Sequence, residues 1–336
     1  MDKEEKIISG LIGFACADAM GVPIEFTSRA AHILKPLTEM VGYGSHSVPA
    51  GTWSDDTSMT IATMDSIREK ETIDYDDIMN KYCEWAKKSK YTATDRLFDI
   101  GIGTRKAIAS YYFHKTSAID SGGKDEHSNG NGSLMRMLPI VYYGFYNHIE
   151  EPELTTLINS YSSLTHGHSI SKLGCHIYYD FMKDLLEGKS KEEAFQNLQN
   201  HSYDQYDEES REKYSRILDG SLKDAEEKTI SSSGFVAHTL EACLWTILRT
   251  DNYEDAVVKA INLGDDTDTV GAITGSMAGI LYGRESIPKR WTDVLIRKDQ
   301  LESLAREFSK VVGNELDQML TTNDEIIENE SHLKNS

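Results

Sequence analysis

Two apolar segments at opposite ends of the chain carry a small residue at every fourth position. These residues are Gly13, Ala17 and Gly21 near the N-terminus, and Gly271, Gly275, Gly279 and Gly283 near the C-terminus. Residues four apart share one face of a helix, so each segment predicts a helix with a row of small residues along one face. Each glycine in a helix interior destabilises the helix by up to about 1 kcal/mol. This cost favours a role for the glycines in letting the backbone of another helix come close. General close packing explains either row alone, but we expect the two helices to pack together and unite both ends of the chain in one domain.

The rest of the sequence is also helical in its pattern, because the two-residue alternation of strands is almost absent. A helix is expected to start at Ser54 or Asp55. Further helices are expected near residues 74–90, 98–114, 150–164, 169–187, 190–200, 208–221, 236–250, 252–263 and 299–320. Two starts carry capping pairs, Ser190 with Glu193 and Asp251 with Glu254. We expect one domain over residues 1–320, followed by a polar, disordered tail over residues 321–336.

Charge and cysteine usage limit the classes of partner. The 336 residues carry a net charge of −20, spread along the chain, which excludes the basic face that nucleic acids and anionic membranes require. The four cysteines show neither a zinc spacing nor a disulfide framework. The first residues are too acidic for a signal peptide, and no apolar run approaches the length of a bilayer span. We therefore expect a cytoplasmic, monomeric protein with reduced thiols and no membrane or nucleic-acid partner.

Two clusters of oxygen-bearing side chains stand out. Residues 262–271, with the sequence NLGDDTDTVG, place three carboxylates and two hydroxyls at the mouth of the second glycine-row helix. Residues 54–57, with the sequence SDDT, open another helix in the same way. Helix capping is the simpler explanation for aspartates at a helix start, but one helix needs only one cap. Repulsion among the acids must be relieved by a cation, a buried proton or splaying into solvent. Such oxygen-rich sites suit Mg²⁺, Mn²⁺ or Ca²⁺, and we expect the two clusters to meet.

Five sequence blocks, in order along nearly the whole chain, carry a family resemblance. They are GFACADAMGVPIEF, GTWSDDTSM, NGNGSLMRMLPI, LTHGHS and NLGDDTDTVGAITGSMAGILYG. Together they resemble the ADP-ribosylglycohydrolase family, which includes the dinitrogenase reductase-activating glycohydrolase and the ADP-ribosyl-acceptor hydrolases. The resemblance implies an all-α fold, a compact single-domain orthogonal helical bundle with a two-metal site.

The same resemblance implies two divalent cations, Mg²⁺ or Mn²⁺. The implied ligands are Ser54, Asp55, Asp56, Asp266, Asp268 and Thr269. Relatives often have glycine where Asp265 stands, so this chain carries an additional acid beside the site. Either Asp265 or Asp266 could therefore be the ligand, and the register of the motif favours Asp266.

Other matching positions imply how ADP-ribose is held. The implied substrate-binding residues are Ser128, Asn129, Gly130, Asn131, Gly132, His166 and Phe235. The glycine-rich loop at 128–132 can expose successive backbone N–H groups to a diphosphate, although a simple connecting loop is the alternative. His166 matches a threonine–histidine pair near the pyrophosphate or ribose, and a hydrogen-bonded structural histidine is its alternative. Phe235 matches a position where relatives place a ring over adenine, with core packing as its alternative.

Catalysis is expected at Glu25, Asp99 and Asp268. In this hypothesis Asp268 lies between two cations that bind the ribose and activate a water, and Glu25 moves the proton between water and leaving group. Asp99 resembles an acid near the acceptor side chain, which suits a guanidinium. We therefore expect hydrolysis of ADP-ribosyl-arginine on a protein. ADP-ribosyl-serine or a small ADP-ribose conjugate is the alternative substrate, and a non-catalytic ADP-ribose-binding or crystallin-like protein is the alternative of another class. A metal-dependent phosphohydrolase acting on a nucleotide is a third possibility.

Overall fold

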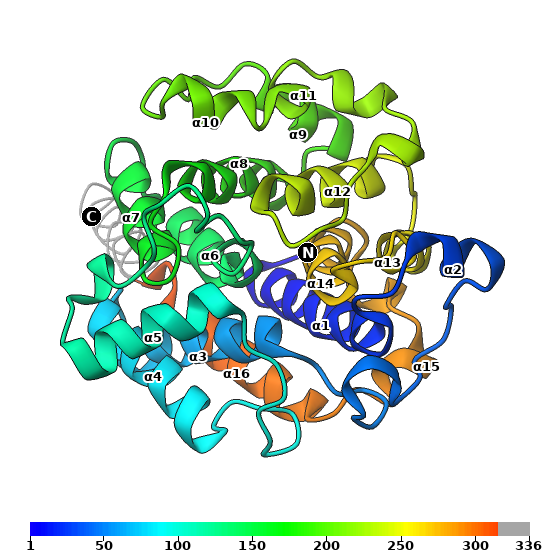
Figure 1. Ribbon diagram of the computed structural model, residues 1–336, viewed down its shortest axis with the longest axis horizontal. Helices are drawn as coiled ribbons and strands as arrows, with labels where there is room; N and C mark the ends of the chain where they lie inside the picture. Colours follow the sequence, from blue (N-terminus) through cyan, green and yellow to red (C-terminus); the bar gives the residue numbers. More distant parts are fainter. Residues whose placement is uncertain (315–336) are drawn as a thin grey trace, which may run out of the picture.

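Helices α1 (Lys3–Gly21) and α14 (Thr267–Tyr282) lie side by side through the middle of the protein (Figure 1). The computed structural model describes residues 1–314. A Cβ atom added to Gly275 would lie 2.3 Å from the carbonyl oxygen of Gly13, and one added to Gly279 would lie 2.2 Å from that of Ser9. No side chain fits between the two backbones at these points. The predicted pairing of the two glycine-row helices is confirmed, so the two ends of the described chain meet in one core.

Fourteen further α-helices surround this pair in the described residues. They are α2 (Arg29–Leu34), α3 (Asp55–Lys70), α4 (Tyr75–Lys88), α5 (Ile102–His114), α6 (Leu138–Tyr146), α7 (Glu153–Ser163), α8 (Ser169–Leu186), α9 (Lys191–Leu198), α10 (Glu208–Glu212), α11 (Ser215–Leu218), α12 (Val236–Leu248), α13 (Tyr253–Ile261), α15 (Lys289–Thr292) and α16 (Lys298–Val311). Short 3₁₀ turns lie at Val22–Ile24, Gly44–His46, Ala118–Asp120, Leu134–Arg136, Ser221–Asp224, Glu227–Thr229 and Arg284–Ser286.

Several helices pack directly against the central pair. Helices α12 and α13 pack against α14, while α16 packs against both α1 and α3 (Figure 1). Over residues 1–314 the only β-type pairings are two isolated bridges, one between Gly123 and His166 and one between Gly130 and Phe235. The described chain is a single all-helical domain, as the sequence predicted.

Several predicted boundaries needed correction. The capping box of Ser190 and Glu193 is confirmed, but the cap predicted at Asp251 is wrong by one residue. The side chain of Asn252 accepts the hydrogen bond from the backbone N–H of Asp255 instead. The helix predicted over 98–114 begins only at 102, and the one predicted over 208–221 is broken into α10 and α11. Helices α2, α6 and α15 were not predicted. The predicted domain end at residue 320 and the tail beyond it lie outside the described residues.

Helix α1 corrects one further expectation about apolar runs. By length and composition alone, residues 3–24 could cross a membrane, so the statement that no run approaches this length was wrong. Nearly all of the segment is buried against α14 and its neighbours, as expected of the core helix of a folded domain. The four cysteines are free and buried, in agreement with the absence of a disulfide framework.

Candidate active site

The end of α1 meets the starts of α3 and α14, and each of these elements contributes buried acids. Asp18 comes from α1, Asp56 from the first turn of α3 and Asp268 from the first turn of α14. One carboxylate oxygen from each of the three lies within 4.8 Å of the others. Close contact between backbones makes this possible, because Cα of Asp268 lies only 2.4 Å from where a Cβ on Gly21 would stand. The two predicted acidic clusters therefore meet.

Asp56 has the environment of a ligand rather than of a helix cap. Its Oδ2 atom accepts a hydrogen bond from Ser54 Oγ at 2.8 Å and lies 3.4 Å from Thr269 Oγ1. Its Oδ1 atom is buried and has no hydrogen-bond partner among residues 1–314. A buried carboxylate oxygen without a partner is costly, and a bound cation would satisfy it. The cap of α3 is Ser54, whose hydroxyl accepts from the backbone N–H of Asp56.

Asp268 belongs to three groups of neighbouring acids. It lies within 4.8 Å of Asp55 and Asp99 in one group, of Glu25 and Asp266 in a second, and of Asp18 and Asp56 in the third. Burial, followed by repulsion from neighbouring carboxylates, raises the pKa of Asp55, Asp56 and Asp268 well above the usual range. An all-oxygen donor set under such repulsion fits hard divalent cations such as Mg²⁺ or Mn²⁺.

Asp265, the additional acid of this chain, does not lie in the acid cluster. Asp265 is exposed and has a positive φ of 59°, while its backbone N–H donates to Thr27 O at 2.9 Å and its carbonyl accepts from Phe26 N–H at 2.7 Å. Asp266 instead faces the acids and accepts a hydrogen bond at 2.6 Å from the side-chain amide of Asn131. This geometry favours Asp266 over Asp265 as the ligand.

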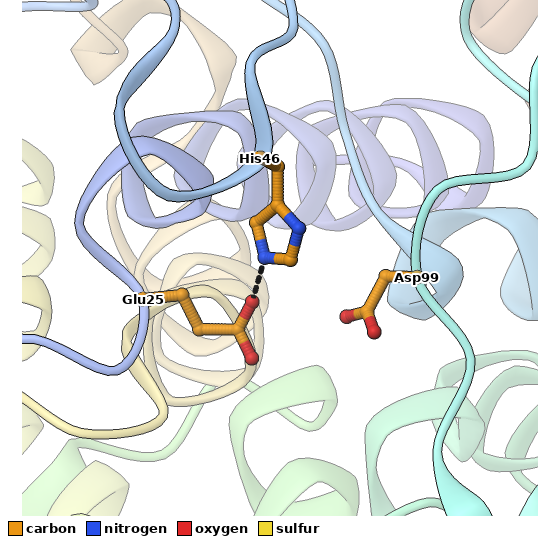
Figure 2. A group of neighbouring side chains, drawn as sticks. All are labelled: Glu25, His46 and Asp99. Carbon is orange, nitrogen blue, oxygen red and sulfur yellow. Dashed lines mark hydrogen bonds and ion pairs between the residues drawn. The ribbon is translucent and has the colours of Figure 1, made fainter.

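Glu25, His46 and Asp99 form a second group at the edge of the acid cluster (Figure 2). Glu25 follows the 3₁₀ turn after α1, and its carboxylate is hydrogen-bonded to His46 Nε2. Asp99 faces this pair from the extended segment before α5. Burial raises the pKa of Glu25 to about 7, against the opposing effect of the His46 hydrogen bond, and that bond raises the pKa of His46. This pair can therefore hold or release a proton near neutral pH.

The acids open into a cavity of about 570 Å³, a volume typical of small-molecule sites. At one end lie the carboxylates, and the remaining walls are glycine-rich and carry few charges. The lining residues at these walls include Gly101, Gly103, Thr104, Lys106, Ser128, Gly130, Asn131, Gly132, His166 and Gly234. The cavity therefore joins an oxygen-rich end to an end made largely of backbone.

Four of the five predicted loop residues and His166 line this cavity, whereas Asn129 and Phe235 do not. The Asn129 side chain turns into the protein, where it donates to Glu126 O and accepts from Ser171 Oγ. The ring of Phe235 packs against His238 at a centroid distance of 5.0 Å. The positions of Asn129 and Phe235 therefore favour structural roles, with the Phe235 backbone pairing with Gly130.

Two residues in the site were not predicted from the sequence. The Asp18 carboxylate accepts hydrogen bonds from the backbone N–H groups of Ser54 and Thr57 and, at 2.6 Å, from Thr57 Oγ1, so it fixes the start of α3. A lone acid within the apolar part of a helix, after its charged first turn, is the signal that could have identified it. His46 gives a weaker signal, as a single histidine within a glycine-rich loop.

Comparisons with known proteins agree with this geometry. Residues 1–317 match the family described as ADP-ribosylglycohydrolase. The chain is 32% identical to an ADP-ribosylarginine hydrolase Tri1 of Serratia proteamaculans, over 90% of this chain and 79% of that protein. It is 26% identical to the ADP-ribosyl-[dinitrogen reductase] glycohydrolase of Rhodospirillum rubrum, over 89% of this chain and 92% of that protein.

A solved structure titled ADP-ribosylglycohydrolase-related protein complex resembles the fold with a TM-score of 0.77 at 28% identity. The match covers 93% of this chain and 99% of that one. The buried acid clusters fit the metal site that is typical of this family. The chain belongs to the ADP-ribosylglycohydrolase family and is an ADP-ribosyl-acceptor glycohydrolase.

Proposed function

We propose that the protein releases ADP-ribose from ADP-ribosylated arginine side chains of proteins, in a reaction that depends on Mg²⁺ or Mn²⁺. The observation that carries the proposal is the position of Asp99, which faces Glu25 across the acidic end of the cavity (Figure 2). Carboxylates match the charge and the forked donors of a guanidinium, whereas a serine hydroxyl offers neither. The names of the relatives from Serratia proteamaculans and Pseudomonas putida, both ADP-ribosylarginine hydrolases, support the same acceptor.

Glu25 is the proposed proton carrier. With a pKa raised to about 7 by burial, its carboxyl group can take a proton from the attacking water and give one to the departing guanidine nitrogen. His46 holds one carboxylate oxygen, which fixes the direction of the other. Groups placed in this way contribute about 10²- to 10⁴-fold to the rate. Asp99 orients the guanidinium from the opposite side.

The residues that would hold the divalent cations lie at the meeting point of the three helices. They are Ser54, Asp55, Asp56, Asp266, Asp268 and Thr269, with a carboxylate oxygen of Asp18 within 4.8 Å of those of Asp56 and Asp268. Bound cations supply positive charge that orients the ribose hydroxyls and makes water more acidic. The unpartnered Oδ1 atom of Asp56 supports this assignment.

The position of Phe26 supports the proposal that the ADP-ribosylated arginine belongs to a protein and not to a small conjugate. This residue lines the cavity beside Glu25, yet its side chain is 72% exposed. Its backbone has a positive φ of 64°, which is an outlier for a bulky residue and is held by Asp265. A large apolar side chain fixed at the mouth can contact the acceptor outside the cavity. Strain of this kind often accompanies a functional position.

The purified protein, supplied with Mg²⁺ or Mn²⁺, can be incubated with matched peptides that carry ADP-ribose on arginine or on serine. Free ADP-ribose released from the arginine peptide at least tenfold faster would support the proposal. Faster release from the serine peptide would overturn the acceptor assignment, and AMP as the product would indicate a phosphohydrolase. Glu25→Gln is the control for hydrolysis by a contaminating enzyme.

A further inference from the structure

A fully buried arginine lies behind the glycine-rich wall of the cavity. The Arg136 guanidinium lies over the rings of Tyr161 and Tyr82, at 4.3 and 5.3 Å from their centroids. It also donates to the Tyr161 carbonyl oxygen at 3.1 Å and to the Tyr82 hydroxyl at 3.2 Å. Among residues 1–314, no carboxylate lies within ion-pair distance of it. A buried charge without an ionic partner is costly, which favours a role for Arg136 beyond packing.

Arg136 is connected to the cavity through a threonine. Its Nη2 atom donates to Thr165 Oγ1 at 2.8 Å, and the same oxygen lies 2.9 Å from His166 Nδ1. The Thr165 hydroxyl has one hydrogen to donate, and within the described chain His166 Nδ1 is the only acceptor at hydrogen-bond distance from it. When the hydroxyl donates this hydrogen to Nδ1, the proton of the neutral imidazole lies on Nε2.

His166 is held so that Nε2 faces the cavity. Its backbone N–H donates to Ser162 O, and its carbonyl accepts from Ser162 Oγ, both at 2.8 Å. Burial and the charge of Arg136 lower the pKa of His166 to about 3, so the ring is neutral at physiological pH. Nε2 has no hydrogen-bond partner among the residues described.

Glycines from two segments leave the Nε2 edge of the ring open to a ligand. A Cβ on Gly103 would lie 3.0 Å from Nε2, and one on Gly130 would lie 3.4 Å from it. A Cβ on Gly132 would lie 2.6 Å from Cε1. A side chain at Gly103 or Gly132 would crowd the ring, and one at Gly130 would touch it. The space next to Nε2 is therefore bounded largely by backbone.

The N-terminus of α5 opens into the same space. Its first intrahelical hydrogen bond runs from Arg105 N–H to Gly101 O at 2.9 Å, and no side chain caps the helix. The backbone N–H groups of Ile102, Gly103 and Thr104 precede that bond, and all three residues line the cavity. Helix N-termini favour phosphate groups through these N–H groups and the helix dipole. Together with Nε2–H of His166, they make this wall suitable for a diphosphate.

We propose that Arg136 is a positioning residue that acts through Thr165 to hold His166 as the Nε2–H tautomer, which donates to the diphosphate of ADP-ribose. Its charge lies behind this wall and also attracts the anionic ligand. In a protein with a net charge of −20, a buried cation at this place offsets part of the repulsion that a diphosphate meets. This inference rests on the proposed function in one respect only, that the cavity holds ADP-ribose.

The tautomer can be measured directly in the wild-type protein. Nitrogen-15 NMR of histidine-labelled protein distinguishes a protonated Nε2 from a protonated Nδ1, and comparison with His166→Gln assigns the signal. We expect a neutral ring with the proton on Nε2 between pH 5 and pH 8. A ring protonated on Nδ1, or a charged ring, would overturn the proposal. This result does not depend on the folding of any variant of Arg136 or Thr165.

Variants of the chain of contacts from Arg136 through Thr165 to His166, here called the relay, test its effect on binding. Thr165→Val removes the hydroxyl at nearly constant volume, and Thr165→Ser keeps it. Titration with ADP-ribose in the presence of Mg²⁺ should give a Kd at least tenfold weaker for the valine variant and within about twofold of wild type for the serine variant. Arg136→Gln, which removes the charge, should also weaken binding at least tenfold.

The possible outcomes separate the two claims. Unchanged affinity and an unchanged His166 signal in folded Thr165→Val would overturn the relay. Equal losses in the valine and serine variants would also contradict it, because only one of them lacks the hydroxyl. If wild-type protein fails to bind ADP-ribose, the proposed function and the binding half of this inference both fail, while the NMR measurement still decides the tautomer.

Discussion

Removal of divalent cations should make the stability of the protein fall as the pH rises. Asp18 is fully buried, and burial raises its pKa from 3.8 to about 7. Between these values the folded state holds a proton that the unfolded state has lost, so the free energy of unfolding decreases with increasing pH. A difference of about three pKa units, at about 1.4 kcal/mol each, corresponds to roughly 4 kcal/mol from this residue alone. The pKa values of Asp55, Asp56 and Asp268 are shifted in the same direction.

Bound cations should reverse this loss. Ligand carboxylates must be ionised, so cations bind more tightly as the pH rises and displace protons. A cation at a hundred times its Kd stabilises a folded protein by about 2.7 kcal/mol. Mg²⁺ or Mn²⁺ should therefore stabilise the protein more at pH 8 than at pH 5.

Urea unfolding at pH 5 and pH 8, with EDTA or with Mg²⁺, measures these changes. The part of the Asp18 effect that lies between pH 5 and its pKa of about 7 is about two units, or roughly 3 kcal/mol. Asp18→Asn should reduce the pH dependence seen with EDTA, while Asp265→Asn, which alters an exposed neighbour of the site, should leave it unchanged. Equal stability of the cation-free protein at pH 5 and pH 8, with the same stabilisation by Mg²⁺ at both, would show that the buried acids are not protonated in the folded state and do not bind the cation.

Three further changes have definite expected results. Glu25→Gln should lower kcat by about 10²- to 10⁴-fold while leaving the Kd for ADP-ribose within about threefold, as measured by steady-state kinetics and titration; an unchanged kcat would exclude Glu25 as the proton carrier. Gly275→Ala should destabilise the protein by about 1–3 kcal/mol in urea unfolding, despite the better helix propensity of alanine, because its Cβ would lie 2.3 Å from Gly13 O; a more stable variant would contradict the close packing. Phe26→Ala should lower kcat/KM about tenfold for an ADP-ribosylated protein but less than twofold for free ADP-ribosyl-arginine, and equal losses would place Phe26 against ADP-ribose instead.

The helical fold and the meeting of its ends could be predicted because the signals are local. Gly13 and Gly275 belong to rows with a spacing of four, and this spacing indicates a helix face wherever the partner lies. The clusters at Asp55 and Asp268 are each dense enough to indicate shared chemistry. They meet because Asp18 of α1 holds the start of α3, while the same end of α1 packs against the start of α14.

Other features could not be predicted because their partners are distant in the sequence. Asp18 binds backbone N–H groups 36 and 39 residues away, and His46 meets Glu25 across 21 residues. Neither contact leaves a local pattern. The start of α13 was placed one residue too early because aspartate and asparagine are comparable caps; Asn252 caps the helix, while Asp251 accepts a hydrogen bond from Lys191 Nζ at 2.9 Å. For Phe235, an aromatic residue between helices, the sequence does not determine which side it faces.

We propose that acids from both ends of the chain bind divalent cations together. Isothermal titration of Mn²⁺ into wild type, Asp56→Asn, Asp268→Asn and the exposed control Asp265→Asn tests it directly. We predict about two ions bound per wild-type chain, the same stoichiometry for the control, and loss of high-affinity binding in both Asp56→Asn and Asp268→Asn, although these residues are separated by more than two hundred positions. Full-affinity Mn²⁺ binding in Asp268→Asn would show that the two ends of the chain do not share the cations.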